Sequence, residues 1–493
     1  MARNPKEAWP PSNLSEVHAA MSEWNAWHLG SSEALSHIYG GGVEDTTGFY
    51  KNGIVGSFRK LFWGNPTPAG ERSTKLHSGL AKNIARTSAN LLFSKAPQVK
   101  SEDAATQERL DAFVDDGIHS TLLEAAETAS ALGGVYLKVV WDESISDRPW
   151  VTAVSPELAV PKWKWDKLEA VTFWKIVSDD GSKVVRLLET HEVGYIQYEV
   201  YEGTHDDLGK PRELADFSET AGLVEMLDEN DAISTGYEGL TAVYVPNMKP
   251  NLLWKNNPAA AHLGRSDFAG IEGLMDQLDE TLSNMMREQR LGKSRLIVDQ
   301  TLVESRGKGK GGAVDYDREL IVPMSLTLKD DGKQPIEMVQ FDFRPQDYLA
   351  AADALREQCI QGSGYSLQTF GLAGEGVEMT ATEVNARERQ TMATRNQKIL
   401  YWKPALANLF KALLAIDKTM NSGTALVETP DIFFGEVATE SLREVAANVL
   451  VLDQAKAISL EEKVRRVNPD FDDDQVADEV TRIRTDTALP EAA

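Results

Sequence analysis

Apolar residues recur at helical spacing in the middle of the chain. Five of them follow one another at steps of three or four residues: Ile271, Leu274, Leu278, Leu282 and Met285. This spacing predicts an amphipathic helix that begins near Asp267 and runs to Arg290. The acids of this stretch are expected on the outer, solvent-facing side of that helix: Asp267, Glu272, Asp276, Asp279, Glu280 and Glu288.

The same helical pattern predicts further helices elsewhere in the chain. Residues 12–38 form one predicted helix, and residues 73–94 form another, for which Ser73 is a candidate N-cap. Three shorter helices are also predicted: 104–115, 120–132 and 346–359. The first 132 residues are therefore expected to be mainly helical.

Other regions read as strands, rich in β-branched and aromatic residues and bounded by turn residues. Residues 133–142 form one predicted strand, and 150–202 form an antiparallel meander with a hairpin turn at 178–183. Residues 241–260 are rich in Pro and Asn and are expected to be a connector. A second small β module follows the helix at 267, with strands in three segments: SRLIVD (294–299), ELIVPM (319–324) and IEMVQF (336–341).

The glycine-rich stretch GLAGEGVEMTATEV, residues 371–384, leads into a very long predicted helix. Thr380 and Glu383 have the spacing of a capping box, so that helix is expected to begin at Thr380 and to be broken at Pro404. The glycines come before the cap, which predicts a mobile loop over residues 362–379. The last sixty or so residues are expected to form short acidic helices.

The chain has 493 residues, too many for one compact core, so two or more domains are expected. Its formal net charge of −25 argues against a protein that holds nucleic acid tightly. It does not argue against a protein that lets DNA slide past. Residues 287–310 are an exception, because seven Lys and Arg residues against three acids give a local balance of +4. This segment is either a solvated basic loop or a contact for DNA or a partner.

The single cysteine, Cys359, excludes an internal disulfide and is expected to pack as a small apolar residue. The sequence has no run of 18 apolar residues and no apolar signal-peptide core near its first residue. We therefore expect neither a membrane-spanning protein nor secretion by the usual route.

Patterns that resemble catalytic or metal sites match only in part. The segment Gly292-Lys293-Ser294 ends like a P-loop, but Arg287 stands where the first glycine is required. The acidic segment at 470–476 has Gln475 at the position where a calcium loop needs glycine. The eight histidines show no metal-ligand spacing. The glycine-rich stretch itself carries Glu375 and Glu378, which would repel a bound phosphate. No catalytic residue, metal or cofactor is expected.

The order of these elements resembles that of the portal proteins of tailed bacteriophages. Four segments carry the resemblance: LAKNIARTSANLLFSKAPQV (80–99), GGVYLKVVWD (133–142), the helix, β module and helix of 267–361, and GSGYSLQTFGLAGEGVEMTATEV (362–384). The resemblance covers nearly the whole chain and rests on the order of the segments, because no single motif is specific by itself.

The resemblance implies an α+β, mostly helical portal fold with small antiparallel β modules that forms a ring. Its regions would be the wing (1–265), the first stem helix (266–290), the clip (291–344), the second stem helix (345–361), the tunnel loop (362–379), the long wing helix and return (380–435), and the crown (436–493).

The resemblance also implies a ring of about twelve copies at one capsid vertex of the virion, assembled in the host cytoplasm. Double-stranded DNA would pass through it during packaging and ejection. Implied partners are the terminase, the major capsid and scaffolding proteins, and the head–tail connector (adaptor) proteins, with no membrane and no catalysis. Two other functions stay open: a nucleotide-using packaging enzyme, and a capsid or scaffold assembly protein.

Two sets of residues are candidate contacts in such a channel. The tunnel-loop set is Gly364, Ser366, Gln368, Thr369, Gly374, Glu375, Gly376 and Glu378. Its side chains are small, polar or acidic, so they can touch phosphates without holding them. The clip set is Arg306, Lys308 and Lys310, expected to contact DNA or a partner at the narrow end of the ring.

Overall fold

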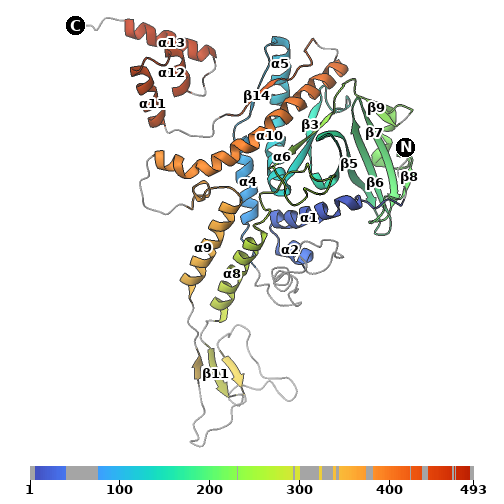
Figure 1. The fold of residues 1–493 in the computed structure, drawn as a ribbon, viewed down its shortest axis with the longest axis vertical. Helices are drawn as coiled ribbons and strands as arrows, with labels where there is room; N and C mark the ends of the chain where they lie inside the picture. Colours follow the sequence, from blue (N-terminus) through green and yellow to red (C-terminus); the bar gives the residue numbers. More distant parts are fainter. Residues whose placement is uncertain are drawn as a thin grey trace, which may run out of the picture. The chain divides into compact units, whose positions relative to one another are not determined.

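The structure is a computed structural model. It describes residues 6–39, 76–229, 231–291, 295–299, 321–324, 337–339, 344–372, 381–421, 424–435, 442–468, 471 and 473–488. The chain divides into two compact units, residues 1–434 and 435–493. Helices and small sheets occupy separate stretches of the first unit, as expected of an α+β fold (Figure 1).

The first unit begins with two helices where the sequence predicts one. α1 (Ser15–Leu29) ends at Gly30, whose φ of +73° suits glycine, and α2 (Ser32–Tyr39) follows. α4 (Leu80–Phe93) starts seven residues later than predicted, and Ser73 lies outside the described residues. α5 (Ala104–Phe113) and α6 (His119–Leu132) confirm the two predicted helices, with the Asp103 side chain capping α5.

Two sheets follow α6. In the first, β2 (Gly134–Val140) pairs on one side with β3 (Trp150–Val154) and on the other with β10 (Ala242–Pro246). The expectation of a connector over 241–260 is therefore wrong at its start. Ala242 and Val245 are buried there, because β10 completes the sheet beside β2.

The second sheet confirms the predicted meander only in part. Its strands pair antiparallel in the order β4 (Ala159–Lys164), β5 (Lys167–Asp179), β6 (Val184–Glu192), β7 (Tyr195–Gly203) and β8 (Lys210–Arg212), and β9 (Ala232–Ser234) also pairs with β7. The start of the predicted stretch, β3, pairs with β2 in the first sheet, and β4 takes its place beside β5. The predicted hairpin turn joins β5 to β6, with Gly181 at a φ of +84° and Asp180 accepting backbone hydrogen bonds.

α8 (Glu272–Leu291) and α9 (Pro345–Gly362) pack side by side (Figure 1). α8 begins five residues after the predicted start, because residues 267–271 form turns in which Gly270 has a φ of +94°. The strands predicted between the two helices are present as β11 (Arg295–Asp299), β12 (Ile321–Met324) and β13 (Glu337–Val339). However, β11 pairs parallel with β12 and antiparallel with β13, so this sheet is mixed and not antiparallel throughout.

α10 (Ala381–Asn421) is one helix of 41 residues, so the predicted break at Pro404 is wrong. Figure 1 shows that it changes direction partway along, as a helix does around an internal proline. The residues on either side stay helical because they are held in the main core. Trp402 stacks edge-on against Phe93 of α4 at 4.8 Å, and Leu406, Leu409 and Phe410 are buried beyond it.

The main core joins α4, α5, α6, β2 and α10, and β14 (Asp431–Phe433) closes it by pairing with β1 (Gln98–Lys100). Residues Glu388–Met420 of α10 are long and apolar enough to cross a membrane, but more than half of their most apolar window is buried within the fold. This stretch is accordingly a core helix of the first unit.

The second unit contains the short helices expected near the end of the chain. They are α11 (Leu442–Gln454), α12 (Leu460–Val467) and α13 (Asp473–Ala488). Ser459 caps α12 by accepting a hydrogen bond from the backbone of Glu462 at 3.2 Å. Val464, Val476 and Val480 form its small core.

Candidate functional site at the junction of α8, α9 and α10

A buried carboxylate joins the segments that meet at the base of the glycine-rich stretch. Asp267, in the turns before α8, accepts hydrogen bonds through Oδ2 from Lys398 Nζ at 2.6 Å and from the Tyr365 hydroxyl at 2.9 Å. The other members of this hydrogen-bond network are Ser88 of α4, Ser130 of α6 and Asn247, which follows β10. We call the whole set the Asp267 cluster: Asp267, Lys398, Tyr365, Ser88, Ser130 and Asn247.

The Asp267 cluster is almost dry. The side chains of Lys398 and Asp267 are 1% and 2% exposed. Burial lowers the pKa of the Lys398 amine, and the Asp267 carboxylate opposes that shift. Burial and the same carboxylate raise the pKa of Tyr365 well above its ordinary value. A charge pair this deeply buried is tolerated because its oxygens and its ammonium are hydrogen-bonded on several sides.

The first part of the predicted loop is ordered against α10. Gly364 has a φ of +91°, and its carbonyl accepts a hydrogen bond from the Thr394 hydroxyl at 2.6 Å. The backbone N–H of Ser366 donates to the Thr391 hydroxyl at 2.9 Å, which also lies 2.8 Å from the Thr369 hydroxyl. Residues 363–372 are therefore a fixed turn and not a mobile loop.

The predicted contact residues fall into two groups. The turn holds Gly364, Ser366, Gln368 and Thr369 together, and Gln368 Oε1 is buried without a hydrogen-bond partner among the described residues. The others lie outside the described residues: Gly374, Glu375, Gly376, Glu378, Arg306, Lys308 and Lys310. α10 begins at Ala381, which agrees with a cap at Thr380, although the cap itself is not among the described residues.

The acids of α8 were expected on its solvent-facing side, and for four of them the structure shows the opposite. Asp267, Glu272, Asp276 and Asp279 are all buried, as is Ser283. Glu272 accepts hydrogen bonds from Trp24 Nε1 of α1 at 2.9 Å and from the Gly270 backbone at 2.8 Å. Glu272 thus holds α1 against the start of α8 through a polar contact.

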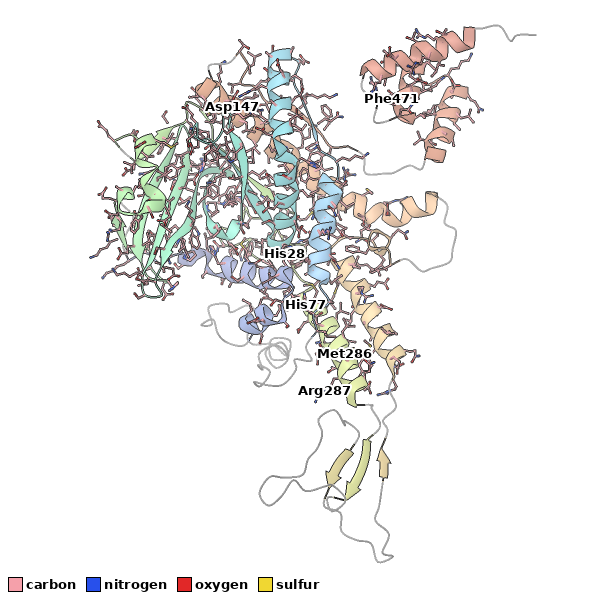
Figure 2. The ribbon with its side chains drawn as sticks, turned by 180° about the vertical axis from the view of Figure 1, so that it is seen from behind. His28, His77, Asp147, Met286, Arg287 and Phe471 are labelled. Atoms are coloured by element: carbon pink, nitrogen blue, oxygen red, sulfur yellow. The ribbon has the colours of Figure 1, made fainter. Side chains whose placement is uncertain are left out.

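Asp279 holds the segment that leads into α4. Its carboxylate lies 2.7 Å from His77 Nδ1 and accepts a hydrogen bond from the Ser78 backbone at 2.8 Å. The His77 ring also stacks against Trp27 of α1, with ring centroids 5.5 Å apart. Figure 2 shows His77 at the meeting point of α4 and α8. One side of α8 thus organises the N-terminal helices around the Asp267 cluster.

The sequence does carry a signal for this buried polar face. Glu272, Asp276, Asp279 and Ser283 are spaced by four, three and four residues, so they lie on one side of the helix. Of the expected apolar seam, Ile271 and Leu278 are buried, and the other three members are only partly buried: Leu274, Leu282 and Met285. Met275, which the expected seam did not include, is buried as well. What the sequence could not supply was the partners of these acids: Trp24 lies 248 residues from Glu272, and His77 lies 202 residues from Asp279.

Cys359 of α9 lies buried in the junction. Burial, with a smaller contribution from Asp279, raises the pKa of the Cys359 thiol to about 12, so this buried thiol is not a nucleophile. It packs as the small apolar residue that was expected. Among the described residues, no group of three or more His, Cys, Asp or Glu side chains could hold a metal ion.

The comparisons with known proteins identify the family. A model of the family described as "Phage portal protein, SPP1 Gp6-like" matches residues 57–488, which is most of the chain and includes every element of the junction. A comparison with curated proteins gave no match. The matched region contains, in chain order, α8, the small sheet of β11, β12 and β13, α9, the turn at 363–372 and α10. The chain belongs to the SPP1 Gp6-like family of phage portal proteins, structural proteins of DNA packaging and head–tail connection.

Proposed function

We propose that about twelve copies of this chain close into a ring at a single capsid vertex, and that double-stranded DNA passes through the ring during packaging and ejection. The observation that carries the proposal is the family match over residues 57–488, together with the order α8, small sheet, α9, anchored turn, α10. Assembly takes place in the host cytoplasm, and the ring becomes part of the virion.

In this proposal α8 and α9 form the stem and the sheet of β11, β12 and β13 forms the clip. Residues up to 265 form the wing, to which α10 returns, and the unit from residue 435 forms the crown. The terminase docks at the clip side from outside the capsid, and connector proteins later take its place. The major capsid and scaffolding proteins surround the wing.

Residues 373–380 are the proposed contact with passing DNA, at the narrowest point of the channel. Two features support this choice. The turn at 363–372 is fixed to Thr391 and Thr394 of α10, and the chain re-enters regular structure at Ala381. Most residues of the segment between these two points are small or acidic. Gly374 and Gly376 permit it several backbone conformations.

The charge of the chain suits a channel. The net charge of −25 repels phosphate, so DNA can move past without a tight bond to each copy. The basic set Arg306, Lys308 and Lys310 is the exception, and we assign it to DNA retention or partner docking at the clip. Among the proposed contact residues 373–380, called the tunnel segment here, Glu375 and Glu378 are negatively charged. They cannot replace the counterions of DNA, so they do not hold it tightly.

Deletion of residues 372–377 tests the tunnel segment. Rings should still form, since the anchoring residues from Gly364 to Thr369 remain, but genome packaging or DNA retention should fall sharply. Normal yields of full-length packaged DNA would contradict the assignment.

Replacing Arg306, Lys308 and Lys310 with Ser tests the clip set. The matched control replaces three exposed lysines elsewhere, Lys82, Lys95 and Lys210, with Ser. The clip variant, and not the control, should lose DNA retention or connector binding. If the two variants behaved alike, the clip set would be a solvated basic loop with no role in DNA retention or connector binding.

We also propose that the chain has no catalytic activity of its own. Support comes from the inert Cys359 thiol and from a family that is structural. Purified protein should hydrolyse no ATP above the rate of buffer alone, with or without DNA. Hydrolysis that copurifies with the ring and disappears on substitution of Lys293 would favour a nucleotide-using packaging enzyme.

A further inference from the structure

The hairpin between β4 and β5 presents an exposed tryptophan at its tip. Trp165 is 90% exposed, and it adopts a φ of +48°, followed by Asp166 at +62°. Two successive left-handed residues at a hairpin tip are normally Asn, Asp or Gly. An exposed tryptophan buries little apolar surface, so it does not stabilise the folded chain at this strained position. A contact with another molecule would account for its presence there.

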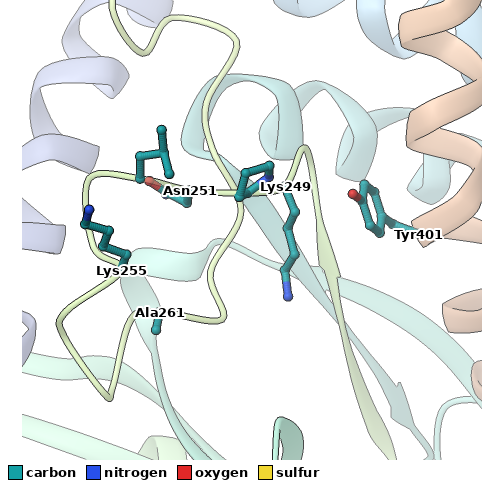
Figure 3. A pocket seen from close by; sticks show the side chains of 7 residues that line it. Lys249, Asn251, Lys255, Ala261 and Tyr401 are labelled. Atoms are coloured by element: carbon teal, nitrogen blue, oxygen red, sulfur yellow. The ribbon is translucent and has the colours of Figure 1, made fainter.

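A cleft beside the tip extends this surface. It has a volume of about 420 Å³ and is lined by Lys249, Pro250, Asn251, Leu252, Lys255, Ala261 and Tyr401 (Figure 3). Leu252 is 70% exposed at its rim. His262 connects cleft and tip, because its Nε2 lies 3.6 Å from Asp166 Oδ1 and its ring stacks on Trp163 at 4.9 Å. We call this region the tip surface.

The tip surface is basic on a strongly acidic protein. Five lysines belong to it against two acids, which is a formal balance of +3: Lys162, Lys164, Lys167, Lys249 and Lys255 against Asp166 and Glu169. Burial lowers the pKa of Lys249, and Asp166 opposes the shift, which places those two groups within electrostatic reach of each other. An acidic partner surface would complement it.

The same chain carries such a surface around α5 and the loop between β2 and β3. Seven acids belong to it against two arginines, a formal balance of −5: Glu108, Asp111, Asp115, Asp116, Asp142, Glu143 and Asp147 against Arg109 and Arg148. Ile145 stands among them and is 72% exposed. Figure 2 labels Asp147 within this region, which we call the acidic surface.

The two surfaces are distinct places on one molecule. Tyr401 lines the cleft of the tip surface, and the buried Asp417 pairs with Arg109 of the acidic surface. Both residues lie on α10, sixteen positions apart, which corresponds to about 24 Å along a helix. They cannot meet within one copy through these residues, but they can meet between copies.

We propose that the tip surface of one copy docks on the acidic surface of the next copy around the ring. A ring of more than two copies needs a head-to-tail interface, made from two different and complementary surfaces of the same chain. The opposite charges fix the orientation of the contact. Trp165 and Ile145 supply an exposed apolar group on each side, and tryptophan is a frequent centre of binding energy. The inference rests on the ring proposed above.

Two variants test this interface. The tip variant carries Trp165→Ala, Lys167→Glu and Lys255→Glu, and the acidic-surface variant carries Asp115→Lys, Glu143→Lys and Ile145→Ala. Each alone should raise the protein concentration needed for ring formation at least tenfold. A control with Lys82→Glu, Val193→Ala and Lys210→Glu, all exposed positions outside both surfaces, should leave it unchanged. Circular dichroism and the melting temperature confirm that each variant is folded.

An equimolar mixture of the two variants is the decisive measurement. The intact acidic surface of one variant can accept the intact tip surface of the other, and the two charge-reversed surfaces also complement each other. The mixture should therefore form rings, seen by analytical ultracentrifugation, at a lower protein concentration than either variant alone. Combining the four charge reversals Lys167→Glu, Lys255→Glu, Asp115→Lys and Glu143→Lys in one chain should restore rings in part.

Several outcomes would overturn the inference. Rings from either variant at the wild-type concentration would show that these surfaces lie outside the interface while the ring itself stands. Loss of duplex DNA binding by the tip variant, with ring formation unchanged, would assign the tip surface to DNA. Absence of rings from the wild-type chain would reject the proposed ring and this interface with it.

Discussion

Lys398 of α10 donates a hydrogen bond to Oδ2 of Asp267, ahead of α8, at 2.6 Å, and neither side chain is more than 2% exposed. The two residues are 131 positions apart in the chain. Through Tyr365 the same oxygen also fixes the turn at residues 363–372. One buried pair thus joins the segment before α8, this turn and α10.

Breaking this pair should destabilise the first unit strongly. Lys398→Met removes the ammonium and leaves the Asp267 carboxylate buried without its counter-charge, which typically costs about 3–5 kcal/mol. Urea unfolding of the intact chain measures the loss. Lys403→Met, at an exposed position of the same helix, should change the free energy of unfolding by less than about 1 kcal/mol. Equal effects of the two substitutions would contradict the role assigned to the pair.

Gly364 should tolerate no side chain. Its φ of +91° disfavours alanine, and an added Cβ would lie 3.1 Å from the Thr394 hydroxyl oxygen. Gly364→Ala is expected to lower the free energy of unfolding by about 1–3 kcal/mol and to loosen the turn. Gly222→Ala is the control, because Gly222 has a helical φ and open space around its Cα. Hydrogen exchange at residues 364–372 should speed up in the first variant only.

Stability should fall as the pH drops from about 6.5 to about 4. Burial lowers the pKa of His18 from 6.5 to about 4 in the folded chain. Between those values the unfolded chain binds the proton more readily, so the stabilisation present above pH 6.5 is lost as the pH falls towards 4. The difference between wild type and His18→Asn should shrink by about 1–3 kcal/mol over that range. A pH-independent difference would mean that His18 titrates normally.

The thiol of Cys359 should be nearly unreactive in the folded protein. It is fully buried, and its pKa is raised to about 12, so almost no thiolate is present at neutral pH. A disulfide reagent should modify it at least a hundredfold more slowly than in urea-unfolded protein. Fast modification without unfolding would indicate that α8 and α9 separate readily around it.

The fold was predictable wherever local pattern decides the structure. α5, α6, α9 and the strands β5, β6 and β7 match the sequence expectations closely, whereas β3 pairs with β2 and not with the meander. β10 was missed because its Pro and Asn neighbours resemble a connector, and only the edge of β2 makes a strand of it. Pro404 does not break α10, because Trp402 and Leu406 on either side are held in the core.

The candidate site was predictable only in part, since its contacts are long-range. The capping spacing of Thr380 and Glu383 located the start of α10. Nothing local indicates that Ser366 and Thr369 bond to Thr391, so the sequence alone predicts a mobile loop where the structure has a fixed turn. The acids at 272, 276 and 279 were assigned to solvent from their charge, although their shared helical face marked them as a group.

Particle imaging of the purified wild-type chain tests the central claim most directly. Single-particle electron microscopy at micromolar concentration and moderate salt should show closed rings with a central hole, and class averages should give one dominant symmetry near twelvefold. Monodisperse monomers under those conditions, or shell-like particles without a channel, would contradict the account.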